Sequence, residues 1–153
     1  MKIHEFLAEG LVLPALEARS KEAVLRELAE QVARQEPEVD AGVLMEHLLA
    51  RERMGSTGVG EGVAIPHGKL PGLPRLLGCF ARSPEGVEYD SMDGRPVHLF
   101  FLLVAPEDSA GAHLRALARI SRLLKSAELR QRLMEAADRE ALYRTILEED
   151  GKF

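Results

Sequence analysis

Two segments in the first third of the chain carry apolar residues at helical spacing. In the first segment the apolar positions fall at i, i+3, i+4 and i+7, namely Leu25, Leu28, Ala29 and Val32. This spacing places them on one face of a helix, and Ser20 is a suitable N-cap because its hydroxyl can accept a bond from a free backbone N–H. The second segment, 41–54, follows Asp40 as its cap and ends before Gly55, a residue type that commonly terminates helices. The pattern therefore predicts two helices before residue 55.

The middle of the chain changes to short apolar runs. Residues 63–66 (VAIP) and 75–83 (RLLGCFARS) are compatible with strands, and 11–14 (LVLP) is a short strand or an extended entry to the first helix. Residues 96–105 (PVHLFFLLVA) are apolar almost throughout, which is typical of a strand buried on both faces of its sheet. Between the second helix and these strands, residues 55–62 contain four glycines in eight positions, which predicts a loop.

Helical spacing returns in the last third of the chain. Residues 109–125 place four apolar residues on one face, namely Leu114, Leu117, Ile120 and Leu124. Two further helices are expected over 127–136 and 139–149, the second with Asp138 as its cap. Because a strand buried on both faces needs helices on both sides, this order of elements predicts an α/β (α+β) fold, a mixed β-sheet covered by helices on both faces. No repeat or long linker interrupts the sequence, so residues 1–153 are expected to form a single layered domain.

Composition and charge narrow the classes of function. The chain is 46% hydrophobic and 29% charged with a net charge of −5, so it has no broad positive field and nucleic acid is not an expected partner. Its longest apolar run, 99–105, is far shorter than the roughly 20 residues that span a bilayer, and membrane insertion is not expected. Cys79 is the only cysteine, which excludes an intrachain disulfide. Together with an N-terminus that lacks a signal-peptide core, this favours a cytoplasmic protein.

The glycine-rich loop does not fit a nucleotide-binding motif. The stretch between Gly62 and Gly68 is one residue too long for a phosphate-binding Walker loop. Val63 stands where a dinucleotide-binding fingerprint would have its third glycine, and the serine in GSTG does not lie in the G-x-S-x-G turn of acyl hydrolases. No cofactor is therefore expected.

The five histidines of the chain do not form a metal-binding motif. None belongs to an HExxH sequence, and no two lie at a metal-binding spacing on one helix face. His4, His47 and His98 are expected to be surface or hydrogen-bonded structural histidines. A metal-dependent hydrolase is accordingly the weakest of the functions considered.

His67 differs from the other histidines in its immediate neighbours. Pro66 has a fixed φ and pushes Ile65 into an extended conformation, so the preceding strand is expected to end rigidly at Pro66. Gly68 has no Cβ that would crowd a group approaching the imidazole ring. A neutral, uncovered imidazole is a nucleophile that can accept a phosphoryl group and pass it on. Without further support, a histidine in a turn with no functional role would account for the same residues.

The stretch RERMGSTGVGEGVAIPHGKL, residues 51–70, resembles the active-site segment of the fructose/mannitol/nitrogen-regulatory class of enzyme IIA domains (EIIA type 2) of the bacterial phosphoenolpyruvate-dependent phosphotransferase system. The resemblance extends to 96–124, which is similar to the core strand and following helix of that family, and to 140–147, which is similar to its closing helix. The GSTG and PHGK segments are closer to the nitrogen-regulatory branch than to the sugar-specific domains.

The resemblance implies a site of three residues. His67 would be the histidine that is phosphorylated on Nε2, Arg51 would place its guanidinium beside the phosphoryl group, and His113 would be the second histidine of the site. Each has a plainer explanation: Arg51 could complement the C-terminus of its helix, with Arg53 as an alternative match, and His113 could pack against the sheet. If a residue such as Ser109 caps the helix that follows, His113 lies near free backbone N–H groups that favour an anion.

The resemblance also implies the partners. An HPr-type phosphocarrier would donate the phosphoryl group, and a IIB component or a regulatory target would receive it or respond to it. Two alternatives stay open: a regulatory interaction module that does not pass the group on, and a sugar-specific (fructose or mannitol) IIA component.

Glu61 lies in the glycine-rich loop and would repel a phosphoryl group, so it is expected to face solvent or to pair with a base. The docking surface around the site is expected to be apolar and formed by Val59, Val63, Ile65 and Leu70.

Overall fold

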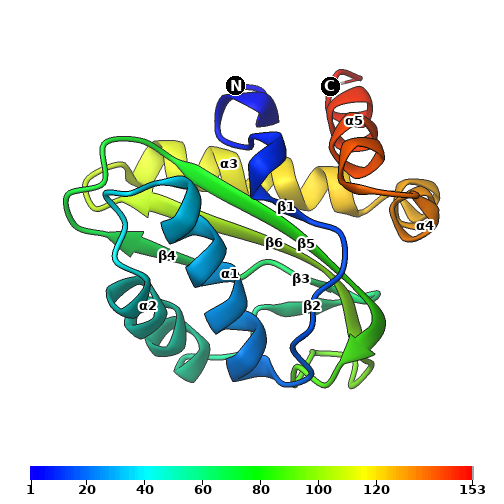
Figure 1. Ribbon diagram of the computed structural model, residues 1–153, viewed down its shortest axis with the longest axis horizontal. Coiled ribbons are helices and arrows are strands. Elements are labelled where there is room, and N and C mark those ends of the chain that lie inside the picture. Colours follow the sequence, from blue (N-terminus) through cyan, green and yellow to red (C-terminus); the bar gives the residue numbers. More distant parts are fainter. Residues whose placement is uncertain (153) are drawn as a thin grey trace.

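A computed structural model of the chain, which describes residues 1–152, has a six-stranded sheet with helices against both faces (Figure 1). The helices α1 (Lys21–Gln35) and α2 (Ala41–Arg53) lie on one face, and α3 (Ala110–Leu124) lies on the other. The remaining helical elements, which pack near α3 and the two chain ends, are α4 (Ala127–Glu135), α5 (Arg139–Asp150) and the short 3-10 turns η1 (Ile3–Glu5) and η2 (Glu9–Leu11). The predicted mixed sheet between helical layers is confirmed.

The strands run in the order β1-β5-β6-β3-β2, and β4 also pairs with β6. Their bounds are β1 (Val12–Leu13), β2 (Gly58–Gly60), β3 (Val63–Ala64), β4 (His67–Leu70), β5 (Leu77–Val87) and β6 (Val97–Pro106). β6 is parallel to β3 and β4 and antiparallel to β5. With neighbours on both sides and helices on both faces, β6 is buried along almost its whole length, as its continuous apolar sequence predicts.

β3 and β4 form one line of chain that is broken at Pro66. Val63 pairs with Leu99 in β3, and His67 pairs with Leu103 in β4, so the residue offset to β6 is the same on both sides of the break. Proline has no N–H to donate to a ladder, but the Pro66 carbonyl still accepts a bond of 3.0 Å from the Leu103 N–H. The break therefore costs the sheet a donor without changing its register.

The helix starts follow the predicted caps. The side chains of Ser20, Asp40 and Asp138 each accept a hydrogen bond from the backbone N–H three residues later, which satisfies an N–H that has no partner inside the helix. Ser109 is the N-cap residue of α3 but makes no such bond. Its hydroxyl instead donates to the Pro106 carbonyl at 2.9 Å.

Three details of the predicted elements are wrong. Residues 55–62 are not all loop, because β2 forms within them, and the predicted strand 63–66 stops at Ala64. The predicted apolar face of α3 is rotated, since Leu114 is 68% exposed. The buried face consists of His113, Ala116, Ile120, Leu123 and Leu124. The glycines of β2 are accommodated because β2 pairs with β3, a non-local contact that local composition does not reveal.

Candidate functional site

His67 is the first residue of β4, so the chain resumes as a strand at this residue rather than ending at Pro66. Its Nδ1 lies 2.9 Å from the Ile65 carbonyl oxygen. A carbonyl can only accept, so Nδ1 carries the proton and Nε2 keeps its lone pair in the neutral ring. A Cβ on Gly68 would meet His47 and Leu48 on α2 at an ordinary 3.6 Å.

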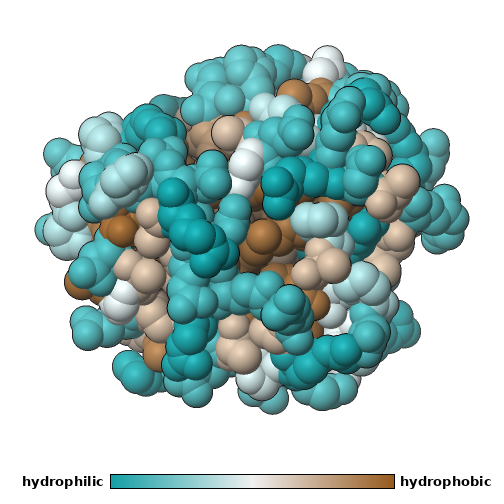
Figure 2. Space-filling model, in the orientation of Figure 1, coloured by the Kyte–Doolittle hydropathy of each residue, from teal (hydrophilic) through white to brown (hydrophobic). Residues whose placement is uncertain are grey.

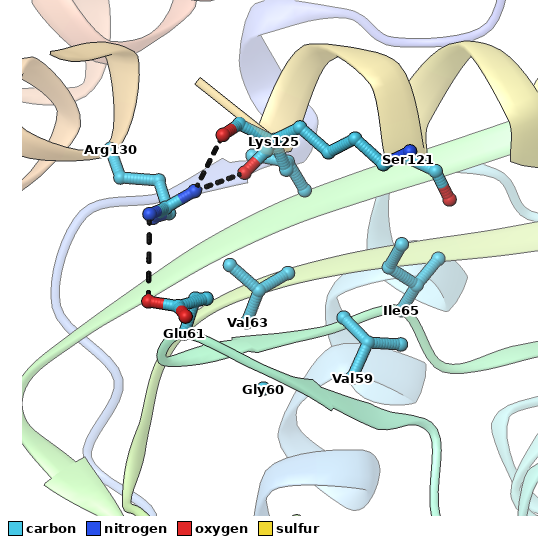
Figure 3. Close-up of a pocket in the computed structure, with 9 residues that line it drawn as sticks. Val59, Gly60, Glu61, Val63, Ile65, Ser121, Lys125 and Arg130 are labelled. Carbon is cyan, nitrogen blue, oxygen red and sulfur yellow. Dashed lines mark hydrogen bonds and ion pairs between the residues drawn. The ribbon is translucent and has the colours of Figure 1, made fainter. Parts of the chain in front are cut away.

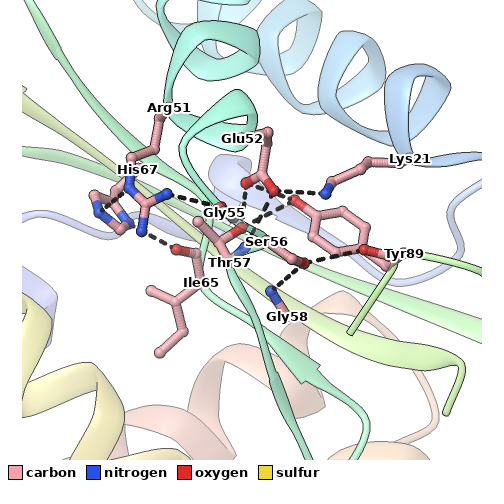
Figure 4. Close-up of polar contacts among 10 residues, drawn as sticks. All are labelled: Lys21, Arg51, Glu52, Gly55, Ser56, Thr57, Gly58, Ile65, His67 and Tyr89. Carbon is pink, nitrogen blue, oxygen red and sulfur yellow. Dashed lines mark hydrogen bonds and ion pairs between the residues drawn. The ribbon is translucent and has the colours of Figure 1, made fainter. Parts of the chain in front are cut away.

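Arg51 reaches Nε2 of His67 from the last turn of α2 (Figure 4). Its Nε–H donates to His67 Nε2 at 3.2 Å, and its Nη1 donates to the Gly55 carbonyl at 2.8 Å. The bond to Nε2 agrees with the Nδ1-protonated form of the ring. Arg53, the alternative match in the sequence, is exposed, and Arg51 is the arginine that contacts His67.

His113 brings a second imidazole to the same place from the first turn of α3. The His67 and His113 ring centroids lie 5.6 Å apart, with the rings edge to face at 75°. His113 is only 8% exposed, and its Nε2 is buried without a hydrogen-bond partner among the described residues. A buried polar atom without a partner is unusual and leaves this ring free to bond to a group that enters the site.

Both imidazoles favour their neutral form. Burial lowers the pKa of His67, and the nearby Arg51 guanidinium lowers it further, partly opposed by the bond to the Ile65 carbonyl. Burial also lowers the pKa of His113, with smaller contributions from His67 and Lys69. Near neutral pH the two rings are therefore uncharged, and the cations that act on them are Arg51 and Lys69.

A polar cluster next to Arg51 was not anticipated from the sequence. The Glu52 carboxylate is 6% exposed and lies 2.8 Å from Lys21 Nζ. It also accepts bonds from the Thr57 N–H, the Thr57 hydroxyl and the Tyr89 hydroxyl (Figure 4). The local sequence does not reveal this cluster, because Lys21 and Tyr89 lie far from Glu52 along the chain.

Glu61 and three of the residues predicted to form the docking surface, Val59, Val63 and Ile65, line a cavity of about 400 Å³ between β2, β3 and α3 (Figure 3). Glu61 is 69% exposed and pairs with Arg130 at 3.7 Å, as expected for a carboxylate that does not face the site. Val63 and Ile65 line the cavity but are buried, as is Leu70. Of the four residues predicted to form an apolar docking surface, Val59 is exposed and the other three are not, because they belong to the core.

The remaining histidines have structural surroundings or none of note. His98 is the second residue of β6, and its Nδ1 lies 2.9 Å from the Ser83 carbonyl, while His47 lies on α2. Residues 1–152 contain no group of three or more His, Cys, Asp or Glu side chains arranged to hold a metal ion. Within the same residues, none of the helices has the length and apolar character needed to cross a membrane.

Curated relatives resemble the chain over nearly its full length. A nitrogen regulatory protein of Bradyrhizobium diazoefficiens is 45% identical over 95% of this chain and 95% of its own. The fructose-specific EIIABC component of Bacillus subtilis is 38% identical over 98% of this chain but only 24% of its own. The chain thus matches nearly the full length of the nitrogen regulatory protein but only one part of the EIIABC component.

Solved structures agree. The nitrogen regulatory protein IIA-Ntr of Neisseria meningitidis superposes with a TM-score of 0.88 at 34% identity and covers 94% of this chain and 98% of its own. IIA mannitol of Escherichia coli shares the fold, with a TM-score of 0.76 at 19% identity, over 91% of this chain and 97% of its own. The family described as "Phosphoenolpyruvate-dependent sugar phosphotransferase system, EIIA 2" matches residues 5–149. The chain therefore belongs to the EIIA type-2 family of the phosphoenolpyruvate-dependent sugar phosphotransferase system.

Proposed function

We propose that this chain is a histidine phosphocarrier whose His67 accepts a phosphoryl group on Nε2. The observation that carries the proposal is the bond from Nδ1 to the Ile65 carbonyl, which leaves the Nε2 lone pair facing Arg51. The donor would be the phosphohistidine of an HPr-type carrier. The Nε2 lone pair forms the new P–N bond, and the P–N bond of the carrier breaks with its electron pair returning to the carrier's imidazole.

The other two residues of the site suit the charge that arrives. The Arg51 guanidinium presents several N–H donors in one plane and can contact two phosphoryl oxygens at once. His113 has a free Nε2, which in its protonated tautomer can donate to a third oxygen. Phosphoryl transfer depends mainly on such positioning and charge stabilisation, and no metal or cofactor needs to take part.

The group would then pass to a IIB component or act as a regulatory signal. The names of the relatives support both branches, since nitrogen regulatory and fructose-specific proteins both match this chain. The E. coli mannitol domain is known in complex with phosphorylated IIB, which supports onward transfer. The higher identity to the Bradyrhizobium diazoefficiens nitrogen regulatory protein, 45% against 38% for the fructose-specific component, supports a regulatory role, with a sugar-specific IIA role as the second candidate.

The test is phosphorylation in a purified system. The chain is incubated with labelled phosphoenolpyruvate, enzyme I and an HPr-type carrier, and we expect an acid-labile, alkali-stable phosphate on His67. His67→Ala should take up no label. A stable phosphate on Ser56 or Thr57, or undiminished labelling of His67→Ala, would contradict the proposal.

Addition of a IIB domain separates the two branches. A carrier loses its label to IIB, whereas a regulatory module retains it. Pull-down with phosphorylated and unphosphorylated chain then shows whether retention changes the choice of partner.

A further inference from the structure

The Glu52 carboxylate collects donors from three separate parts of the chain. Lys21 comes from the start of α1, Tyr89 from the segment after β5, and Thr57 from the turn that leads into β2. The carboxylate is almost fully buried at 6% exposure. A buried carboxylate is costly unless donors satisfy it, so this arrangement fixes the position of each donor relative to the end of α2.

The segment most affected is the turn 54–57 between α2 and β2. Its far end is held by two bonds from Thr57 to Glu52, and by Ser56, whose hydroxyl donates to the Tyr89 carbonyl at 3.1 Å. Gly55 lies between these anchors with a φ of 141°, a conformation that favours glycine. The Gly55 carbonyl is consequently held in one direction.

That carbonyl is one of the two partners of Arg51. It accepts from Nη1 at 2.8 Å, while Nε donates to His67. A free arginine side chain has many rotamers, and the Gly55 carbonyl is the contact that selects the one facing Nε2. A line of contacts thus runs from Glu52 through Thr57 and Gly55 to Arg51.

We propose that Glu52 is a positioning residue that acts on His67 through the Gly55 carbonyl and Arg51. The proposal rests on the proposed phosphoryl transfer at His67 and adds to it the device that holds the cation in place. Lys21 balances the charge of Glu52, and both hydrogen-bond partners of Arg51 are uncharged groups. Arg51 therefore keeps its positive charge for the phosphoryl oxygens while Glu52 fixes its direction.

The first test compares transfer rates. Thr57→Val keeps the shape of the side chain and removes the hydroxyl bond, and Glu52→Gln removes the carboxylate charge. Both should slow labelling of His67 at saturating carrier by about tenfold or more, since a ~1 Å misplacement can cost on the order of 100-fold. The carrier concentration at half-maximal rate should stay unchanged, and Thr57→Ser should restore the rate. Glu46→Gln, an exposed glutamate on the same helix, is the matched control and should behave as wild type.

The second test asks whether the effect passes through Arg51. In an Arg51→Ala background, Thr57→Val should cause no further loss, because the two changes interrupt one line of contacts. Wild-type rates in both Thr57→Val and Glu52→Gln would overturn the inference, and so would losses that add fully to that of Arg51→Ala. If Glu52→Gln does not fold, Thr57→Val and its Thr57→Ser rescue still decide the question.

A third measurement does not depend on transfer. The Nε–H of Arg51 should give a resolved, slowly exchanging NMR signal that disappears in Thr57→Val. An unchanged signal would overturn the positioning role. If wild-type chain takes no label at all, the proposed function fails, and this signal still reports separately on whether Glu52 positions Arg51.

Discussion

A single backbone contact decides which nitrogen of the neutral His67 ring keeps its lone pair. The Ile65 carbonyl lies only two residues back in the chain and accepts a hydrogen bond from the Nδ1–H, so Nε2 keeps its lone pair. The sequence predicts an exposed, rigidly presented imidazole from Pro66 and Gly68. It could not predict the tautomer, because the direction of the Ile65 carbonyl depends on how the chain bends between β3 and β4.

The lowered pKa values of His67 and His113 predict the pH dependence of the reaction. Both lie below the ordinary histidine value of about 6.5, mainly because of burial. Nε2 is a nucleophile only when the ring is neutral, so the rate of phosphorylation should be constant above about pH 6.5 and decline only at lower pH. A pH–rate profile, together with NMR titration of both rings, measures this. A rate that is already half lost at pH 6.5 would contradict it.

The same shifts predict how stability depends on pH. When the pKa of a histidine is lower in the folded chain, the unfolded chain binds more protons below about pH 6.5, so the free energy of unfolding rises with pH in that range. The contribution is complete above about pH 6.5 and is lost as pH falls through the lowered pKa of His67 and His113. Denaturant titrations at several pH values should show this slope, and the double variant His67→Ala/His113→Ala should show a smaller one.

Removal of His113 should affect transfer more than folding. The loss of one charge-assisted hydrogen bond is worth about 1.5–3 kcal/mol, which corresponds to a roughly 10- to 150-fold slower rate if it is felt fully in the transition state. His113→Ala should therefore still be labelled at His67, but slowly. Rates and the melting temperature should be measured on the same variant. A normal rate in a clearly destabilised protein would show that His113 is a core residue only.

At the scale of elements, the helices are predictable because their signals are local. Ser20, Asp40 and Asp138 each cap a helix within three residues of themselves. The strand β2 is not predictable in this way, since its glycines gain their conformation from pairing with β3. The Glu52 cluster has the same difficulty: its members meet only when α1, α2 and the segment after β5 are packed together.

The close approach of β2 to the segment after β5 predicts opposite effects for two Gly→Ala changes. A Cβ on Gly58 would lie 2.9 Å from the Ser91 Cα, a backbone atom that cannot move aside easily. Gly58→Ala should lower the free energy of unfolding by about 1–3 kcal/mol.

Gly111→Ala is the control for Gly58→Ala. Gly111 lies in α3, where a Cβ would meet only the flexible end of Arg115, so stability should be unchanged or raised by up to ~1 kcal/mol. Both values come from urea titrations. Equal effects of the two changes would mean that the approach to Ser91 imposes no constraint.

At the scale of the molecule, the surface is mostly hydrophilic with separate apolar patches on the face seen in Figure 2. Three exposed apolar side chains lie near residues of the site in the sequence. Met54 lies three residues after Arg51, Val59 lies between Arg51 and His67, and Leu114 follows His113. We expect these three, rather than the buried Val63, Ile65 and Leu70, to contact the carrier. The period of the apolar residues alone does not distinguish a core strand from an exposed one. A transient carrier complex of modest area should have a Kd that is micromolar or weaker.

Leu114→Glu tests this surface. Leu114 is next to His113 and 68% exposed, so a charge there should raise the carrier concentration at half-maximal labelling by about tenfold, with little change in the saturated rate. Val43→Glu is the control, because Val43 is exposed at the opposite end of α2 from Arg51. A lower saturated rate with unchanged carrier affinity would show that Leu114 acts on the site and not on docking.

The constant register of β3 and β4 against β6 limits where the chain can change in length. Side chains alternate between the two faces of a strand, so one residue inserted between Ala64 and His67 would either bulge out or shift β4 by one position. A shift would turn the His67 side chain to the other side of its strand and break its contacts with Arg51 and His113. The turn 71–76, which joins β4 to β5, can take up extra residues without moving the ring. The number of residues between β3 and His67 is therefore fixed, while the length of the neighbouring loop is free to vary.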